Sequence, residues 1–243
     1  ALSMFRPYMD NPQLRKLATE LRDIGRIVGE LRDADVLKED ITLPAILRSG
    51  RQPENEELLS ILKGRCELMR EAVRADIGSA RWNGLLLRLA LLEHGWTGGE
   101  FDPAAARTKV KDFARKAITR SWKLVRDSGR NLDQLDEAGR HQLRKDLKSL
   151  RYTMEFLRSL HKPGAWQRFR RKLKELQTQF GYLNDVHMAK SLPAMIGNGH
   201  DLSPDTAMLA GFIDGWHEAG AKDVLDDLEW HWRRLEKHAG FWK

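Results

Sequence analysis

An all-α fold is predicted for this 243-residue chain by three observations. Leu, Arg, Glu and Ala, which favour helices, are abundant. No segment shows the apolar–polar alternation that is typical of a β-strand. Proline, glycine and asparagine residues cluster at a few points, and the stretches between these points are long enough for helices.

These clusters define the expected helices in chain order. Breaks are expected at 10–12, 48–53, 95–103, 128–129, 161–164 and 193–204. Helices are expected between them at 13–35, 54–77, 104–126, 136–160 and 166–189. Two more are expected at 204–219 and 221–238, separated by Gly220, because glycine weakens a helix interior.

An internal repeat divides the chain in two. Six residues recur 152 positions later with the same or a similar type: Leu21, Ile24, Val28, Gly29, Leu31 and Asp33 match Leu173, Leu176, Phe180, Gly181, Leu183 and Asp185. A Leu-Pro-Ala sequence follows each copy, beginning at Leu43 and at Leu192. We therefore expect a single domain made of two homologous helical halves, about 1–100 and about 101–243, related by a pseudo-two-fold axis.

The same spacing places the counterpart of His141 before Ala1. We expect Ala1–Arg6 to be the tail of a first basic helix, equivalent to Thr153–Arg158 in the second half. A basic, histidine-containing segment is accordingly expected upstream of Ala1.

Positive charge is concentrated in one segment, Arg140–Lys174. It holds twelve Lys/Arg residues and two acids, a formal charge of +10, whereas the whole chain carries +7. Read as a helix, its first part has an apolar stripe of Leu143, Leu147, Leu150, Met154 and Leu157. The opposite stripe consists of His141, Arg144, Lys145, Lys148, Arg151 and Tyr152.

A solvated surface is the ordinary explanation of a charged stripe. Ordinary solvated faces, however, mix acids and bases at helical spacing, and Glu155 is the only acid near this stripe. Like charges on one helical face repel each other. The pattern therefore favours contact with a polyanion.

Two other helices carry cationic sides. In the helix expected at 166–189, Arg168, Arg171 and Lys172 lie on a polar face opposite an apolar stripe, and His187 continues that stripe and is expected to be packed. In the helix expected at 104–126, the cationic side consists of Lys109, Lys116 and Lys123, with Arg115, Arg120 and Arg126 nearby. This second side can wall the same site or be an ordinary solvated face.

The sequence resembles the CHAD family, the conserved histidine α-helical domain. The resemblance is carried by His141-Gln142-Leu143-Arg144 with Lys148, Arg151 and Tyr152, by Gly181-Tyr182-Leu183-Asn184-Asp185, and by the first-half equivalent Gly29–Val36. It implies two four-helix bundles that enclose a basic central cavity, and it implies binding of inorganic polyphosphate. Arg and Lys donors suit this ligand, which has phosphates but no bases.

The expected polyphosphate-binding residues combine this resemblance with the charge pattern. They are His141, Arg144, Lys145, Lys148, Arg151, Tyr152, Arg168, Arg171 and Lys172 in the second half, Lys16, Arg22 and Arg26 in the first half, and Arg115 and Lys116. Tyr152 is expected to donate its hydroxyl. For His141 we expect donation to phosphate, with a purely structural role and a phospho-acceptor role as the alternatives.

Other functions receive less support from the sequence. A nucleic-acid-binding protein is the first alternative, because the same cations neutralise any phosphate backbone, but Tyr152 is the only aromatic residue in the basic stripe. A phosphoanhydride-processing enzyme is the second, although no converging carboxylates, metal ligands, catalytic residues or cofactor motif are visible. The single cysteine, Cys66, is expected to be buried. No membrane-spanning stretch is seen, and a cytoplasmic location, with polyphosphate granules as a further site, is expected.

Overall fold

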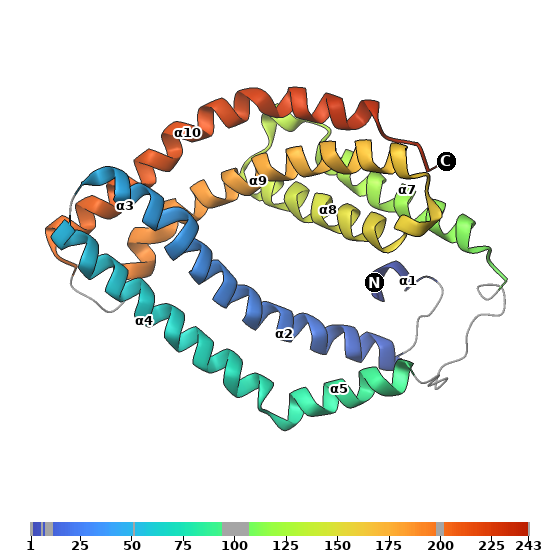
Figure 1. Cartoon of the computed structure of the whole chain (residues 1–243), viewed down its shortest axis with the longest axis horizontal. Helices are drawn as coiled ribbons and strands as arrows, with labels where there is room; N and C mark the ends of the chain where they lie inside the picture. Colours follow the sequence, from blue (N-terminus) through green and yellow to red (C-terminus); the bar gives the residue numbers. More distant parts are fainter. Residues whose placement is uncertain are drawn as a thin grey trace. The chain divides into compact units, whose positions relative to one another are not determined.

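The computed structural model describes residues 2–5, 7, 12–50, 52–93, 107–197 and 202–242, and every regular element in these ranges is a helix. The helices, labelled in Figure 1, are α1 (Leu2–Phe5), α2 (Pro12–Val36), α3 (Leu43–Ser49), α4 (Gln52–Ile77), α5 (Ala80–Glu93), α7 (Val110–Ser128), α8 (Glu137–Phe156), α9 (Pro163–Gly197) and α10 (Pro204–Lys237). Three short elements complete them: a π-helix at Leu37–Thr42 and 3₁₀ turns at Leu132–Gln134 and Arg158–Leu160. The all-α prediction is confirmed.

The helix break expected at Gly220 is wrong, and the break expected at 193–204 begins later than expected. Gly220 lies inside the continuous helix α10, and the Tyr182 hydroxyl occupies the space beside it: a Cβ on Gly220 would lie 2.2 Å from that oxygen. The glycine thus permits a close helix–side-chain approach and does not end the helix. Pro193 likewise lies inside α9, which continues to Gly197. The break expected at 95–103 lies outside the described residues, as does the start of the helix expected at 104–126.

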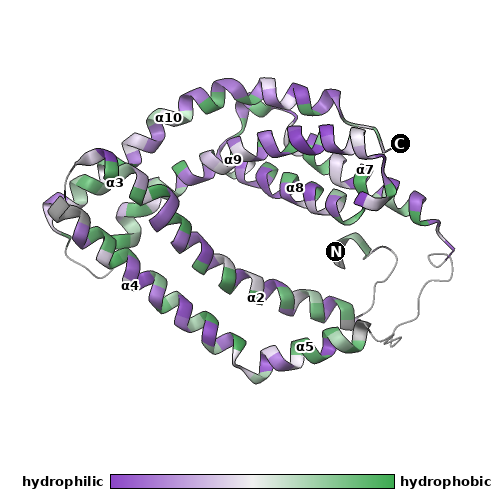
Figure 2. Ribbon diagram, in the orientation of Figure 1, coloured by the Kyte–Doolittle hydropathy of each residue, from purple (hydrophilic) through white to green (hydrophobic). Residues whose placement is uncertain are grey.

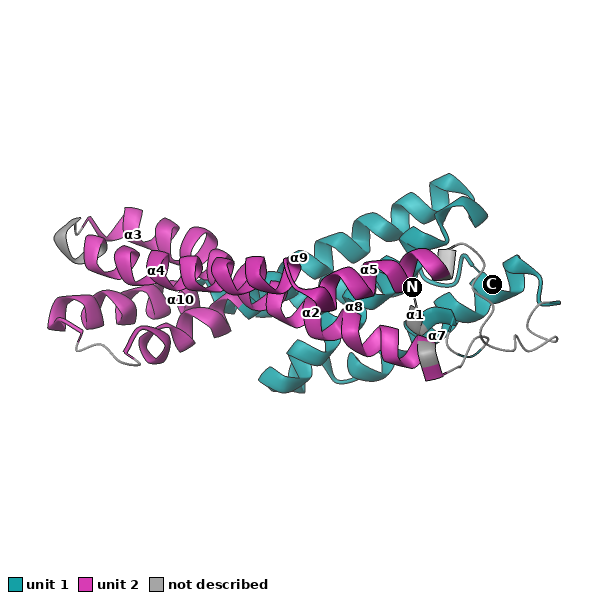
Figure 3. Cartoon of the chain, turned by 90° about the horizontal axis from the view of Figure 1, so that it is seen from below, with its two compact units in different colours: residues 1–7, 102–184, 220–243 teal, residues 8–101, 185–219 magenta. Residues whose placement is uncertain are grey.

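The chain forms two compact units, coloured separately in Figure 3. Unit 1 contains residues 1–7, 102–184 and 220–243, and unit 2 contains residues 8–101 and 185–219. The boundaries therefore fall inside α9, after Asn184, and inside α10, before Gly220. The boundaries of the compact units do not coincide with those of the two repeat copies, and neither division implies the other. The pseudo-two-fold arrangement of two halves therefore stays a prediction.

Amphipathic helices supply the core of each unit, and Figure 2 shows hydrophilic and hydrophobic residues interleaved along the labelled helices. In unit 1, α7 packs along α8, and Trp122 of α7 contacts Phe169 of α9, Trp232 of α10 and Trp242, with ring centroids 5.8, 6.3 and 6.2 Å apart. In unit 2 the core is aliphatic and draws on α3, α4 and the unit 2 parts of α9 and α10. No helix in the described ranges is long and apolar enough to cross a membrane.

Candidate functional site

Helix α8 positions the basic stripe predicted from the sequence. Asp136 caps the helix, and its carboxylate accepts a hydrogen bond from the backbone N–H of Gly139 at 2.8 Å. The predicted apolar stripe is confirmed as core: its members are at most 3% exposed (Leu143, Leu147, Leu150, Met154 and Leu157). Burial of each such side chain contributes about 1.5–3 kcal/mol, so the orientation of α8 about its axis is strongly determined.

The opposite face of α8 is accessible along its length. We call its six residues the α8 row: His141, Arg144, Lys145, Lys148, Arg151 and Tyr152. His141, Lys145 and Tyr152 are exposed, whereas Arg144, Lys148 and Arg151 are half-buried. The sequence therefore predicted correctly which side of this helix stays accessible.

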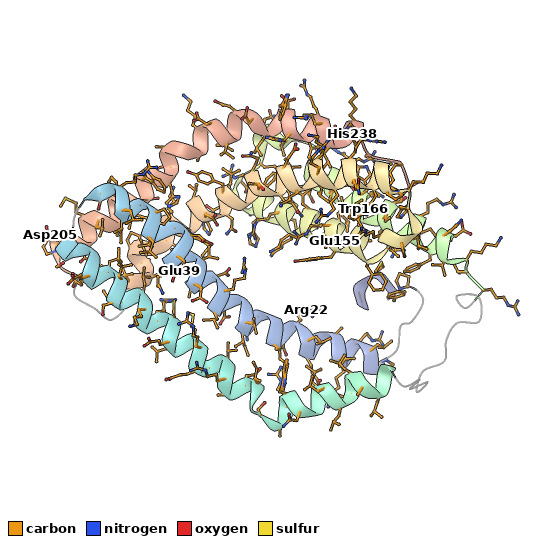
Figure 4. All side chains as sticks on the ribbon, in the orientation of Figure 1. Arg22, Glu39, Glu155, Trp166, Asp205 and His238 are labelled. Carbon is orange, nitrogen blue, oxygen red and sulfur yellow. The ribbon has the colours of Figure 1, made fainter. Side chains whose placement is uncertain are left out.

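The two acids of the basic segment are both engaged by residues outside the row. Asp146 accepts hydrogen bonds from the Ser128 hydroxyl at 2.6 Å and from the Gln142 amide at 3.0 Å. Glu155 lies 3.7 Å from Nε of Arg170 on α9, and Figure 4 labels it beside Trp166. Within the described part of the chain, no ion pair is formed by Arg144, Lys145 or Arg151. Three cations of the row are thus left with their charge uncompensated by acids.

Arg151 and Tyr152 form a stacked pair within the row. The guanidinium carbon of Arg151 lies 4.8 Å from the centroid of the Tyr152 ring, and Tyr152 is 56% exposed. Nε of Arg151 is buried and has no hydrogen-bond partner among the described residues. The contact with the ring orients the guanidinium, whose two terminal nitrogens have no hydrogen-bond partner among the described residues and can donate to a ligand.

The α8 row lies opposite the buried side of α8, and Arg170 of α9 reaches Glu155 at the C-terminal end of the row's face. Trp166 of α9 donates from Nε1 to the carbonyl of Met154 at 3.4 Å, so α9 lies on the core side of α8. Residues two positions from a buried residue lie on roughly the opposite side of a helix, since each residue turns the helix by about 100°. Lys148 and Tyr152 are each two positions from the buried Leu150. The row therefore lies on the side of α8 that faces outward from the core of unit 1.

Lys172 is a correction to the sequence analysis. It was expected on a polar face among the polyphosphate-binding residues, but it is 5% exposed, and its Nζ donates to both carboxylate oxygens of Glu175 at 2.8 Å. The reason is its position on the flank of α9 that α10 covers, where His231 of α10 lies 3.3 Å from the side-chain amide of Gln179. Burial opposes ionisation of Glu175, but the hydrogen bond and charge of Lys172, with the charges of Arg234 and His231, outweigh it and lower the pKa of Glu175. Lys172 is therefore part of an internal ion pair.

Arg168 and Arg171 are exposed on α9, and a site that they share with the α8 row stays a prediction. Arg171 is two positions from both Phe169 and Leu173, which are buried toward the core. Phe169 contacts Trp122 of α7, so Arg171 lies on the side of α9 opposite this contact.

Helix α7 carries cations that the sequence analysis noticed but selected only in part. Arg115 pairs with Asp112 at 3.4 Å, on a flank of α7 different from that of Lys116. Lys116, Arg120 and Lys123 are all exposed and are spaced four and three residues apart, so they share one face. Helical spacing from Lys116 would have identified Arg120 and Lys123, and not Arg115, as the residues that share its face.

The first-half residues belong to unit 2. Lys16, Arg22 and Arg26 of α2 are exposed, Arg22 is labelled in Figure 4, and Arg26 pairs with Glu30 at 2.9 Å. A cavity shared by these residues and the α8 row would join the two units, and it stays a prediction.

Three further expectations concern other groups. Cys66 is buried as predicted, and burial, assisted by the charge of Asp35, raises the pKa of its thiol. His187, expected to be packed, is exposed, because the buried side of α9 there is formed by Met188, Ala189 and Leu192. Among the described residues no group of three or more His, Cys, Asp or Glu could hold a metal ion.

Comparison with known proteins connects this geometry to a family. The CHAD domain family model matches residues 1–193. The crystal structure of the CHAD domain from the plant Ricinus communis has 22% sequence identity and a TM-score of 0.76, covering 97% of this chain and 76% of that one. PptA from Streptomyces chartreusis has 17% identity and a TM-score of 0.73, covering 96% of this chain and 84% of the other. The search of curated proteins finds no match.

Proposed function

Because this chain belongs to the CHAD domain family, we propose that it binds inorganic polyphosphate through the α8 row and does not transform it. The observation that carries the proposal is the composition of that face. It consists of five cationic or titratable groups and one phenol, while the neighbouring acids Asp146 and Glu155 are engaged with other residues.

The chemistry of the row suits a chain of phosphates. Guanidinium groups donate two parallel hydrogen bonds to non-bridging oxygens, and ammonium groups add point charge. Arg144, Lys148 and Arg151 recur at intervals of three to four residues, so they follow the helix axis and can meet successive phosphates of one linear anion. Because polyphosphate has no bases, it requires no stacking surface.

Binding without catalysis follows from the same composition. Hydrolysis or transfer of a phosphoanhydride needs a base or a metal to activate the attacking group. The α8 row offers donors but no carboxylate. We propose the cytoplasm, including polyphosphate granules, as the place of action.

Single-stranded nucleic acid is a second candidate, and one observation favours it. Phe156 lies one helical turn after Tyr152, and both side chains are 56% exposed, although the Phe156 ring also contacts Phe5 of α1, with ring centroids 5.7 Å apart. Exposed aromatic rings beside cations can stack on bases. This candidate predicts preference for a polyanion that carries bases.

A competition titration separates the two candidates. Fluorescently labelled long-chain polyphosphate is bound to the protein at physiological salt and displaced with unlabelled polyphosphate or with single-stranded DNA of matched charge. We expect polyphosphate to displace the label at least tenfold more effectively. Equal or stronger displacement by DNA would replace the proposal with nucleic-acid binding, and the absence of any binding would reject both.

A further inference from the structure

Two rows of cations lie on the same outward side of the α7–α8 pair. The second, which we call the α7 row, consists of Lys116, Arg120 and Lys123. Lys116 and Arg120 are each two positions from Ile118, which is fully buried, so they point away from the core as the α8 row does. The phenyl ring of Phe169 on α9 contacts Trp122, which places α9 on the core side of α7 as well.

The side-by-side packing of α7 and α8 is established by two polar contacts. The hydroxyls of Ser121 and Thr153 lie 3.3 Å apart, and the Ser128 hydroxyl donates to Asp146 at 2.6 Å. As the residue number rises on α7 it falls on α8, so the two helices are antiparallel. The contacts place Lys123 at about the level of Arg151 and Tyr152 along the pair.

The α7 row, like most of the α8 row, has no compensating acids. No ion pair is formed by Lys116, Arg120 or Lys123 within the described ranges. The two acids of α7 are engaged by cations outside the row: Asp112 lies 3.4 Å from Arg115, and Asp127 lies 3.4 Å from Arg130. Mutual repulsion along this face is therefore unrelieved by the protein itself.

The dimensions of the two rows decide which anions can reach both. At about 1.5 Å per residue, the α8 row extends for about 16 Å and the α7 row for about 10 Å. Packed helix axes lie about 8–10 Å apart. Apolar side chains separate the rows: Leu124 and Phe156 are exposed, and Phe5 of α1 contacts Phe113 of α7 and Phe156 of α8 with ring centroids 4.8 and 5.7 Å apart. These side chains offer no donor to an anion. A short anion can occupy one row, whereas a long flexible polyanion can follow one row and cross to the other.

We infer that the α7 row is a second contact surface for the same ligand and makes binding depend on the length of the polyphosphate chain. The inference rests on the proposed function of the α8 row. A chain already held by α8 presents its free end to α7 at high effective concentration, so weak contacts there add to the affinity of long chains only. Tripolyphosphate is short enough to be bound by one row alone, so the second row does not increase its affinity.

The test compares two double variants of α7 with identical charge change. Arg120→Gln with Lys123→Gln removes two members of the α7 row, and Lys111→Gln with Arg126→Gln removes one lysine and one arginine that are exposed elsewhere on the same helix. Affinities for long-chain polyphosphate and for tripolyphosphate are measured by isothermal titration calorimetry at several salt concentrations. Circular dichroism checks that all variants remain helical.

The expected result is specific to the row and to the length of the ligand. The Arg120/Lys123 variant should bind long-chain polyphosphate about tenfold more weakly than the control variant and bind tripolyphosphate within twofold of it. The slope of log affinity for the long chain against log salt should become shallower by about 1.4, corresponding to two lost phosphate contacts on a single-stranded polyanion.

Three other outcomes overturn the inference in distinguishable ways. Equal weakening by both double variants would mean a general charge effect without a second row. Equal weakening for both ligands would place Arg120 and Lys123 in one short site and remove the dependence on length. If the parent protein binds neither ligand, the proposed function itself fails, and the second row has no ligand to contact.

Discussion

Reversing three charges of the α8 row is the most direct perturbation of the proposed site. In the triple variant Arg144→Glu, Lys148→Glu and Arg151→Glu, no core residue changes, because the buried stripe of α8 consists of other positions. A hydrogen bond to a charged group is worth about 1.5–3 kcal/mol when it is shielded from water. All three side chains are only half-buried, so we discount each contact to about 1–1.5 kcal/mol.

The three contacts together then contribute about 3–4.5 kcal/mol, which corresponds to a loss of affinity of about 10²–10³-fold at 1.4 kcal/mol per tenfold change. The repulsion between the new carboxylates and phosphate adds to this loss. The assay is a fluorescence titration with labelled long-chain polyphosphate, and circular dichroism at 222 nm with thermal unfolding reports whether the helices are intact. A variant that is folded and binds as tightly as the parent would show that the α8 row is not the site.

Four further expectations test individual residues. Tyr152→Phe keeps the ring that contacts Arg151 and should bind polyphosphate within about twofold of the parent, whereas Tyr152→Leu should bind about threefold more weakly. Equal weakening of both variants in a titration would assign the role to the hydroxyl, which both lack. Lys172→Met should lower the free energy of unfolding by about 2–4 kcal/mol in chemical denaturation, because it leaves Glu175 partly buried without its partner. The folded state lowers the pKa of Glu175 below its ordinary value of 4.5. The stability that the ionised Glu175 contributes should therefore be present above about pH 5 and lost as the pH falls further. If a Glu175→Gln variant loses stability below pH 5 in the same way as the parent, this expectation is contradicted. Gly129→Ala should lower Tm, because the new Cβ would lie 2.4 Å from the Trp232 ring and cost about 1–3 kcal/mol of stability. The control variant Gly211→Ala, whose Cβ has open space around it, should raise Tm. Equal changes of Tm in the two variants would refute the steric reason.

The helical periodicity of the sequence was sufficient to identify the buried and accessible sides of α8. Side chains at intervals of three and four residues fall on one face of any α-helix, so Leu143, Leu147 and Leu150 had to be buried together. The acid-poor basic stripe lies opposite for the same local reason. Both features depend on one helix alone and need no knowledge of its neighbours.

Whether each of the remaining cations is buried or exposed depended on which helix packs beside it. Arg171 and Lys172 are adjacent in the sequence, yet α10 covers the flank of α9 that carries Lys172 and leaves Arg171 in solvent. Gly220 predicts a helix break in the sequence, but in the structure it is the residue of α10 against which Tyr182 packs. Periodicity describes the sides of a single helix, whereas burial and pairing arise between helices that are distant in sequence. The sequence by itself therefore determined the helices and the accessible face of α8, and the tertiary structure alone decided that Lys172 is internal and that the α7 and α8 rows share one side of unit 1.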